Sequence, residues 1–211
     1  MHPNSLLLFR RDAMPYFKDG LRVLEIGPSF PSPFQREVAG RALQWETLDI
    51  YESPNLTYST TDPYHFPIPD ETFDIVFSAQ VIEHVGSIWR WIPEVARITK
   101  VGGRVITINP VNWGFHEHPV DCWRIYPDGM RALYGDAGLE VELSNSGSLE
   151  RVSSLLSKRG AKWMLRPLIR GSNGGEPLFP IDTCTVGVRK PTARPPHLTA
   201  SRATADAETR R

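Results

Sequence analysis

The feature that most constrains this chain is a regular alternation of short apolar runs with amphipathic stretches. Each apolar run has the length and the β-branched content of a strand, and the stretches between them have helical spacing. The expected strands are residues 22–26, 45–50, 56–60, 73–78, 104–109, 140–145 and 182–189. The pattern therefore predicts an α/β protein with a Rossmann-like, seven-stranded, mostly parallel sheet, right-handed crossovers and helices on both faces.

The helices between these strands have recognisable ends. Ser32 is an N-cap residue, and Pro33 follows it at the first helical position. A third helix is expected to contain WIPEVARITK and to run into Gly102 and Gly103. The remaining expected limits are Asn4 or Ser5 at the start of the first helix, Gly40 at the end of the second, and a fourth helix from near Pro127 to near Gly138.

The composition excludes several classes of protein. The 211 residues include 24 basic and 24 acidic side chains, so the chain has no formal net charge and lacks the footprint of a nucleic-acid partner. No apolar stretch approaches the roughly 18 residues of a membrane span, and the run Leu6 to Phe9 is too short for a signal peptide. Cys122 and Cys184 are too few for a disulfide framework, so a cytoplasmic location is predicted.

The chain is expected to form one domain over residues 1–190, followed by a disordered tail at 191–211 that has few apolar side chains. Within the domain, residues 157–176 combine basic and apolar side chains and interrupt the sheet pattern. This segment is interpreted as a lid, a homodimer contact, a surface for anionic lipid or glycan, or an ordinary amphipathic helix.

A cofactor signature lies where the first three strands end. In VLEIGPSF the strand ends near Glu25, and Gly27 lets a ligand approach the backbone. Asp49 ends the second strand at the distance along the chain where an acidic side chain binds a ribose, and Asp62 follows the third strand. The chain lacks GxGxxG, which counts against a dinucleotide and an NAD-dependent oxidoreductase. S-adenosylmethionine (SAM), which has no pyrophosphate, fits the signature better.

The segments EIGPS, LDIYES, TTD and FPIPDETFDIVFSAQVIEHV, with a later GGRVITINP, resemble the motifs of class I SAM-dependent methyltransferases over roughly residues 21–109. The resemblance implies the class I methyltransferase fold and SAM as cofactor. Pro28 and Ser29 stand where the family more often has a second glycine. The cofactor-binding residues that the resemblance implies are Glu25 and Gly27 at the methionine part, Asp49 at the ribose, Asp62 and Pro63 near the adenine, and Ser78, Ala79 and Gln80 beneath the sulfonium. Pro28, Ser29 and Ile50 are further candidates for binding the cofactor.

The candidate acceptor site is the connection NPVNWGFHEHPVDCWRIYPDGM after the fifth strand. His116 or His118 is a candidate general base, with Asp121 orienting the imidazole or binding the acceptor. Two alternatives stay open, a loop that only hydrogen-bonds its own backbone and a divalent metal bound by His116, His118 and Asp121. His84, after the fourth strand, is a further catalytic candidate.

Aromatic and basic side chains in the same connection are candidates for binding the acceptor, since their flat rings stack on sugars or aromatic groups. They are Trp113, Trp123, Arg124 and Tyr126. HPVDCWRIYPDGM resembles a motif of methyltransferases from bacterial polysaccharide and glycan pathways, which implies a sugar or oligosaccharide hydroxyl as acceptor. The sequence thus predicts a SAM-dependent O-methyltransferase. The alternatives are a non-catalytic SAM-binding subunit, a nucleic-acid methyltransferase and N- or C-methylation of another small molecule.

Overall fold

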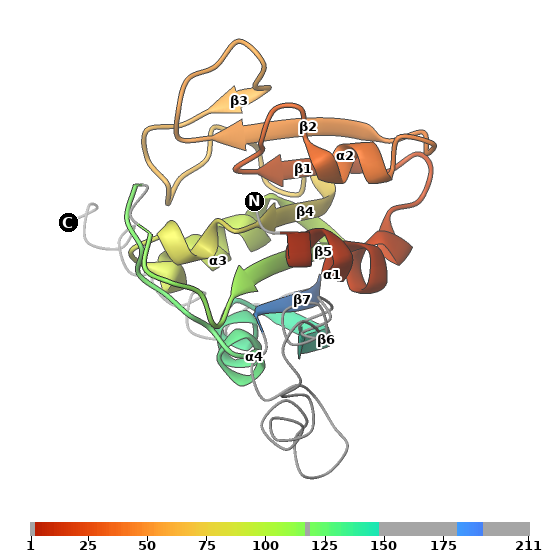
Figure 1. Ribbon diagram of the computed structural model, residues 1–211. Coiled ribbons are helices and arrows are strands. Elements are labelled where there is room, and N and C mark those ends of the chain that lie inside the picture. Colours follow the sequence, from red (N-terminus) through yellow and green to blue (C-terminus); the bar gives the residue numbers. More distant parts are fainter. Residues whose placement is uncertain (1–2, 117–118, 148–180, 192–211) are drawn as a thin grey trace, which may run out of the picture.

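The computed structural model describes residues 3–116, 119–147 and 181–191, and these form one seven-stranded sheet in the order β3-β2-β1-β4-β5-β7-β6 (Figure 1). The strands are β1 (Arg22–Ile26), β2 (Gln44–Asp49), β3 (Tyr58–Ser59), β4 (Phe73–Ala79), β5 (Thr99–Pro110), β6 (Leu139–Gly147) and β7 (Asp182–Arg189). Strands β1 to β5 pair in parallel, and β7 lies antiparallel between β5 and β6. The predicted α/β fold and mostly parallel sheet are confirmed.

Helices cover both faces of this sheet. Their bounds are α1 (Pro3–Leu8), the π-helical turn η1 (Phe9–Ala13), the 3-10 turns η2 (Met14–Tyr16) and η3 (Ile82–His84), α2 (Pro33–Glu37), α3 (Ile88–Ile98) and α4 (Pro127–Asp136). One apolar cluster joins the N-terminal helical segment and α2 to one face of the sheet, and a second joins α3 and α4 to the other. The chain therefore has the layered arrangement expected of a doubly wound sheet.

Successive side chains along a strand point to opposite faces of the sheet and so belong to different parts of the core. Val23 and Phe77 belong to the cluster under α2, whereas their neighbours Leu24 and Val76 belong to the cluster under α3. Aromatic rings dominate the first cluster, where the ring centroids of Phe34 and Phe77 lie 4.8 Å apart. Since both faces of the strands are buried, the central strands hold a fixed register, which places the residues at their carboxyl ends.

Two helix ends settle predictions made from the sequence. Ser32 caps α2, because its Oγ accepts a hydrogen bond from the backbone N–H of Gln35 at 3.1 Å. Helix α3 ends at Ile98, not at the glycine pair, because Thr99 already pairs with Phe73 of β4. Gly103 lies within β5, where a Cβ would come 2.8 Å from the carbonyl oxygen of Lys100. The prediction that α3 runs into Gly102 and Gly103 was therefore wrong, since close backbone contacts in a strand explain the glycine at position 103.

The predictions for segment 157–176 and for the tail beyond residue 191 lie outside the described residues, and the domain limits at 1–190 and 191–211 stay predictions. In the part of the chain that the structure describes, no helix has the length and apolar character to cross a membrane.

Candidate cofactor and acceptor site

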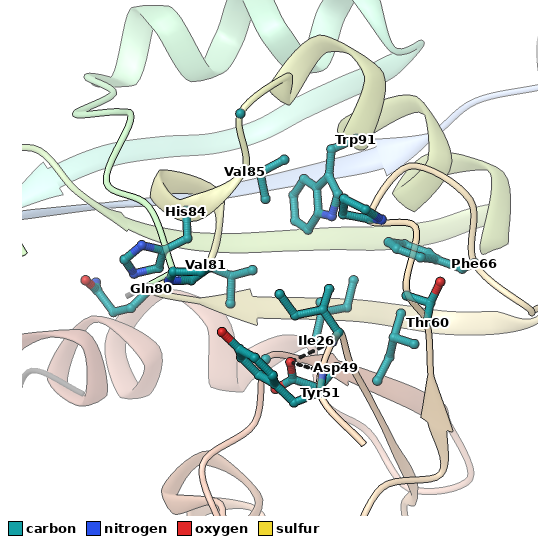
Figure 2. Close-up of a pocket in the computed structure, with 16 residues that line it drawn as sticks. Ile26, Asp49, Tyr51, Thr60, Phe66, Gln80, Val81, His84, Val85 and Trp91 are labelled. Carbon is teal, nitrogen blue, oxygen red and sulfur yellow. Dashed lines mark hydrogen bonds between the residues drawn. The ribbon is translucent and has the colours of Figure 1, made fainter. Parts of the chain in front are cut away.

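A cavity of about 350 Å³ opens at the carboxyl ends of β1, β2 and β4, on the side of the sheet where α/β proteins bind ligands. Its volume is in the range of small-molecule sites, about 300–1,000 Å³. Figure 2 shows Gln80 and His84 at one end of this cavity and Thr60 and Phe66 at the other. The cavity therefore has a polar end with an imidazole and an opposite, more apolar end.

Gly27 lies in the wall of this cavity, directly after β1. Its φ of +68° is in the left-handed region that favours glycine, and its N–H donates to the carbonyl of Leu48 at 2.9 Å. A Cβ at this position would come 2.5 Å from Cγ2 of Val81. A side chain is thus excluded both by the backbone conformation and by the cavity wall.

Asp49 ends β2 and lines the same cavity. Its Oδ1 accepts hydrogen bonds from the backbone N–H groups of Ile50 at 2.6 Å and Tyr51 at 3.3 Å. These two bonds fix the carboxylate at the turn after the strand. Oδ2 has no hydrogen-bond partner among the described residues, so it can accept from a hydroxyl group of a ligand.

The opposite end of the cavity contains Phe66 and Trp91, which are buried, together with Thr60 and Pro63. Asp62, next to Pro63, is exposed, does not line the cavity, and uses its Oδ1 to accept the N–H of Tyr64 at 2.8 Å. Of the two residues predicted near an adenine, only Pro63 contributes to the wall. The ring of Phe66 is a surface on which a flat base can stack.

Glu25 lies behind the cavity wall instead of within it. It is 2% exposed, and its carboxylate accepts hydrogen bonds from Ser32 Oγ and Trp45 Nε1, both at 3.0 Å. Burial raises its pKa to about 7, although the two hydrogen bonds act in the opposite direction. Because Ser32 also caps α2, Glu25 connects β1 to the start of that helix and fixes the ends of the loop at 27–32.

Four further predicted cofactor residues do not line the cavity, namely Pro28, Ser29, Ser78 and Ala79. Ser78 is buried and its Oγ lies 3.5 Å from Oγ1 of Thr107. Ile50 and Gln80, in contrast, do line it. Ser78 and Ala79 are the last two residues of β4, and Pro28 and Ser29 lie in the loop after Gly27, so the cavity is lined by neighbours of these four residues.

Gln80 has a positive φ of 57°, and its Nε2 donates to Ser5 Oγ at 3.0 Å and to Asp182 Oδ1 at 3.1 Å. Asn4 also donates to Asp182, from Nδ2 to Oδ2 at 2.8 Å. Helix α1 and the first residue of β7 therefore hold the floor of the polar end. Sequence analysis did not identify this connection, because its partners lie up to 178 positions apart.

His84 and His116 lie side by side at the polar end, with ring centroids 5.1 Å apart. Nδ1 of His84 contacts the carbonyl oxygen of Val120, and Nδ1 of His116 lies 3.2 Å from that of Gly114. A carbonyl accepts but never donates, so each Nδ1 carries a proton, and in the neutral imidazole the lone pair is then on Nε2. His84 lines the cavity, whereas His118 lies outside the described residues.

Glu83, which sequence analysis passed over, completes this group. One ligand-type atom from each of Glu83, His84 and His116 lies within 4.8 Å of the others. Glu83 is fully buried, and neither of its carboxylate oxygens has a hydrogen-bond partner in the described part of the chain. Burial raises its pKa to about 8, with the negative charges of Asp182 and Asp121 contributing. The only sequence signal was its position beside His84.

Asp121 organises the connection that carries His116. Its side chain makes a bidentate ion pair with Arg124, at 2.5 and 2.7 Å, and accepts the backbone N–H of His116 at 2.8 Å. These hydrogen bonds, the Arg124 contact foremost, hold the pKa of Asp121 well below its usual range. Asp121 is therefore an anion that shapes the loop, and Arg124 is engaged in the same ion pair.

The aromatic residues predicted to bind an acceptor differ in exposure. Trp113 and Tyr126 are about half exposed, and Phe115, which was not predicted, is 76% exposed. Trp123 instead packs against the core, and its Nε1 donates to the carbonyl of Val85 at 2.8 Å. Exposed rings thus flank the imidazole of His116 along the chain, while Trp123 fixes the connection to the turn after η3.

Comparison with known proteins relates this site to a family. Residues 31–107 match the family model described as a methyltransferase domain. A demethylmenaquinone methyltransferase from Thermobifida fusca (strain YX) is 27% identical over 114 residues, which are 44% of this chain and 48% of that protein. The matching region thus spans about half the length of this curated relative.

Solved structures share the fold. A SAM-dependent methyltransferase from Aquifex aeolicus has a TM-score of 0.56 at 16% identity, covering 88% of this chain and 93% of that one. A complex of the Haloferax volcanii Trm112 methyltransferase activator with a methyltransferase gives a TM-score of 0.62 at 18% identity, covering 89% of both chains. The class I methyltransferase fold predicted from the sequence is confirmed.

Proposed function

We propose that this class I SAM-dependent methyltransferase domain transfers the methyl group of SAM to a hydroxyl group of a saccharide acceptor. The observation that carries the proposal is one continuous cavity in which Gly27 and Asp49 line the wall and His84 lies at one end. This arrangement provides a place for a nucleoside and, beside it, a lone pair that can accept a proton.

The residues present fit SAM. Gly27 presents its backbone in the cavity wall, Oδ2 of Asp49 can accept from a ribose hydroxyl, and the ring of Phe66 offers a stacking surface for adenine. The methionine part then lies toward Gln80, at the end of the cavity that contains His84. When bound, SAM supplies an electrophilic methyl group on a sulfonium.

The other predicted cofactor residues act in different ways in this proposal. Ile50 and Pro63 contact the nucleoside directly, since both line the cavity. Glu25 is a positioning residue, because it holds Ser32 at the end of the loop that begins with Gly27. That loop includes Pro28 and Ser29.

The imidazole at the end of the cavity activates the acceptor. His84 keeps its Nε2 lone pair because its Nδ1 proton is directed to the carbonyl of Val120. In its neutral form it can accept the proton of a hydroxyl group, a contribution of typically 10²–10⁴-fold in rate. His116 lies beside it, and its Nδ1 is likewise directed to a backbone carbonyl. It can therefore serve as the base for an acceptor in a different orientation.

A saccharide is the acceptor class that the surrounding side chains favour. Trp113, Phe115 and Tyr126 expose flat rings on the connection next to His116, and such rings stack on the apolar faces of sugars. The motif resemblance over residues 118–130 supports the same class. The second candidate is methylation of a quinone ring, supported by the demethylmenaquinone methyltransferase among the relatives.

Calorimetry tests the cofactor half of the proposal. The protein is expected to bind SAM and its demethylated product, S-adenosylhomocysteine, and not NAD. Asp49→Ala is expected to weaken binding by about 10- to 100-fold, since a hydrogen bond to a charged group contributes roughly 1.5–3 kcal/mol. Asp62→Ala is the matched control, because that carboxylate lies outside the cavity wall. Absence of heat from either nucleoside with folded protein contradicts the proposal.

Turnover with labelled SAM tests the acceptor half. Unmodified sugars and oligosaccharides are compared with hydroquinones, and label retained on a sugar oxygen supports O-methylation. Label on a quinone carbon supports the second candidate instead. Tight cofactor binding with no product from any acceptor supports a non-catalytic SAM-binding subunit. Full turnover by His84→Ala and by His116→Ala excludes the two described imidazoles as the base, and His118→Ala extends the test to the third histidine.

A further inference from the structure

We propose that Glu83, His84 and His116 form a binding site for one divalent transition-metal cation beside the cofactor pocket. The three residues come from η3 and from the connection after β5, and one ligand-type atom of each lies within 4.8 Å of the others. This set differs from the one predicted from the sequence, because it includes Glu83 and not Asp121. Asp121 is instead occupied by Arg124 and by the N–H of His116.

The buried carboxylate of Glu83 is the first argument for a cation. Its side chain is fully buried, and both oxygens are without a hydrogen-bond partner in the described residues. Buried carboxylates are normally hydrogen-bonded, paired with a cation, or metal ligands. The nearest ring nitrogen, Nε2 of His84, lies 3.8 Å from Oε1, too far for a hydrogen bond. A cation between these two acceptors satisfies both.

The orientation of the two imidazole rings is the second argument. Each Nδ1 is directed at a backbone carbonyl, that of Val120 for His84 and that of Gly114 for His116. Histidines that bind a metal usually donate the other ring N–H to a carbonyl or carboxylate, which fixes the ring and directs the free nitrogen to the ion. Asp121 Oδ2 adds to this support, 3.4 Å from Nδ1 of His116.

The chemistry of the three donors indicates the class of ion. Two imidazole nitrogens and one carboxylate suit Zn²⁺, Mn²⁺, Fe²⁺ or Co²⁺, whereas Mg²⁺ and Ca²⁺ prefer sites made of oxygen atoms. Three protein ligands leave at least one coordination position open, as in catalytic sites. With bonds of about 2.0–2.2 Å, two ligand atoms of one ion lie at most about 4.4 Å apart. The group must therefore contract slightly, and His116, with a side chain 40% exposed, has room to turn.

The place of the site connects it to the cavity. Because His84 lines the pocket, a cation on its Nε2 lies at the end of the pocket where Gln80 is found. There its open position can take an oxygen of the acceptor and lower the pKa of a hydroxyl group. With the ion bound, this activation replaces the role of His84 and His116 as bases, because their Nε2 lone pairs then bind the metal. This role rests on the proposed function, whereas the existence of the site does not.

Calorimetry of the untagged full chain, stripped with EDTA and dialysed, tests the site with Zn²⁺, Mn²⁺ and Mg²⁺ as separate probes. One equivalent of Zn²⁺ or Mn²⁺ is expected to bind, and Mg²⁺ is expected to bind much more weakly. Loss of a supporting group alone typically lowers metal affinity 10- to 100-fold, so Glu83→Gln and His116→Ala are each expected to lower it by at least about tenfold.

His65→Ala is the matched control. His65 and Glu94 lie at the same separation, with Nδ1 and Oε1 3.8 Å apart, but Glu94 is already hydrogen-bonded by Arg97 and by the N–H of Phe66. This variant is expected to bind the ion as the wild type does. Bound Co²⁺, followed by its visible absorption, reports nitrogen ligation directly and is expected to change in His116→Ala but not in His65→Ala.

Two results overturn the site. One is wild-type protein that binds none of the ions, and the other is a stoichiometric ion whose affinity is unchanged in His116→Ala. Because His116 is partly exposed, that variant is expected to fold even where Glu83→Gln does not, and thermal melting checks this. S-adenosylhomocysteine titrated in EDTA measures the cofactor site separately, so failure of the cation site is distinguished from failure of the proposed function.

Discussion

The site has two regions that differ in what holds them in place, a proposed cofactor end and a proposed acceptor end. At the proposed cofactor end, Gly27 and Asp49 have positions fixed by the register of β1 and β2. At the proposed acceptor end, loop carbonyls and Arg124 hold His84, His116 and Asp121. The first end depends on backbone geometry within a paired sheet. The second depends on side-chain hydrogen bonds and one ion pair. Substitutions at the first end are therefore expected to cause a large loss of SAM binding. Substitutions at the second end are expected to cause only a partial loss of activity toward the acceptor.

Gly27→Val is expected to have the largest effect. A left-handed backbone costs a non-glycine residue roughly 1–2 kcal/mol, and the new Cβ meets Val81 Cγ2 at 2.5 Å. Val81 also lines the cavity, so displacing it changes the shape of the wall around the proposed cofactor. The affinity for SAM is therefore expected to fall by more than about 100-fold. Calorimetry with S-adenosylhomocysteine provides the measurement.

The double variant Gly27→Ala with Val81→Ala separates the two causes. Removing Cγ2 of Val81 relieves the contact but leaves the positive φ in place. The double variant is expected to bind better than Gly27→Ala alone and worse than the wild type. Wild-type affinity in Gly27→Val with an intact fold contradicts the assignment of this end to the cofactor.

Glu25 gives the next largest effect, on stability. Its pKa is about 7 in the folded protein against 4.5 ordinarily, so between these pH values the folded state binds the proton more tightly than the unfolded state. The free energy of unfolding is therefore expected to fall by about 3 kcal/mol as pH rises from about 4.5 to above 7. Glu25→Gln is expected to remove this pH-dependent change in the free energy of unfolding, which urea unfolding at pH 5 and pH 8 measures.

The control for this experiment is Glu37→Gln. Glu37 forms an exposed ion pair with Arg10, and its pKa is lowered, not raised, by that contact. The decrease in stability toward high pH is expected to persist in this variant. An unchanged decrease in Glu25→Gln assigns the effect to another buried acid such as Glu83, whose pKa is about 8.

The difference between the two ends also explains how much could be predicted from the sequence. Strand positions follow from apolar patterning, so β1 and β7 have the predicted bounds and the site residues Gly27 and Asp49 were identified at strand ends. The same patterning missed Glu83, because an acidic residue beside a histidine normally indicates a solvated turn. Its burial results from tertiary contacts around η3 that no local pattern records.

Some contacts at the acceptor end are equally invisible in the sequence. Nδ1 of His84 meets a carbonyl 36 positions away, and Gln80 binds Asp182 across 102 positions. Pro28, Ser29, Ser78 and Ala79 were placed at the cofactor by resemblance, which locates a motif but not which side chains face the cavity. Helix α3 was extended too far because glycine usually ends helices, whereas here Gly103 lies in a strand.

Asp121→Asn tests the acceptor end and is expected to have an intermediate effect. Loss of the charge weakens the bidentate pair with Arg124 and loosens the loop that carries His116. If the lost ion pair contributes about 1 kcal/mol to transition-state binding, kcat/KM for the acceptor is expected to fall about fivefold while SAM affinity stays unchanged. Asp128→Asn is the matched control, because it removes another ion pair of the same spacing, with Arg131, on an exposed surface of α4.

Trp113→Ala is expected to have the smallest effect. The ring is 49% exposed, so it contributes only part of its area to a bound saccharide, and KM for the acceptor is expected to rise about threefold with kcat unchanged. Trp113→Phe keeps a flat ring and is expected to recover most of the affinity. A change in kcat instead of KM means that Trp113 orients the reacting hydroxyl, and the acceptor end then depends on positioning as strictly as the cofactor end does.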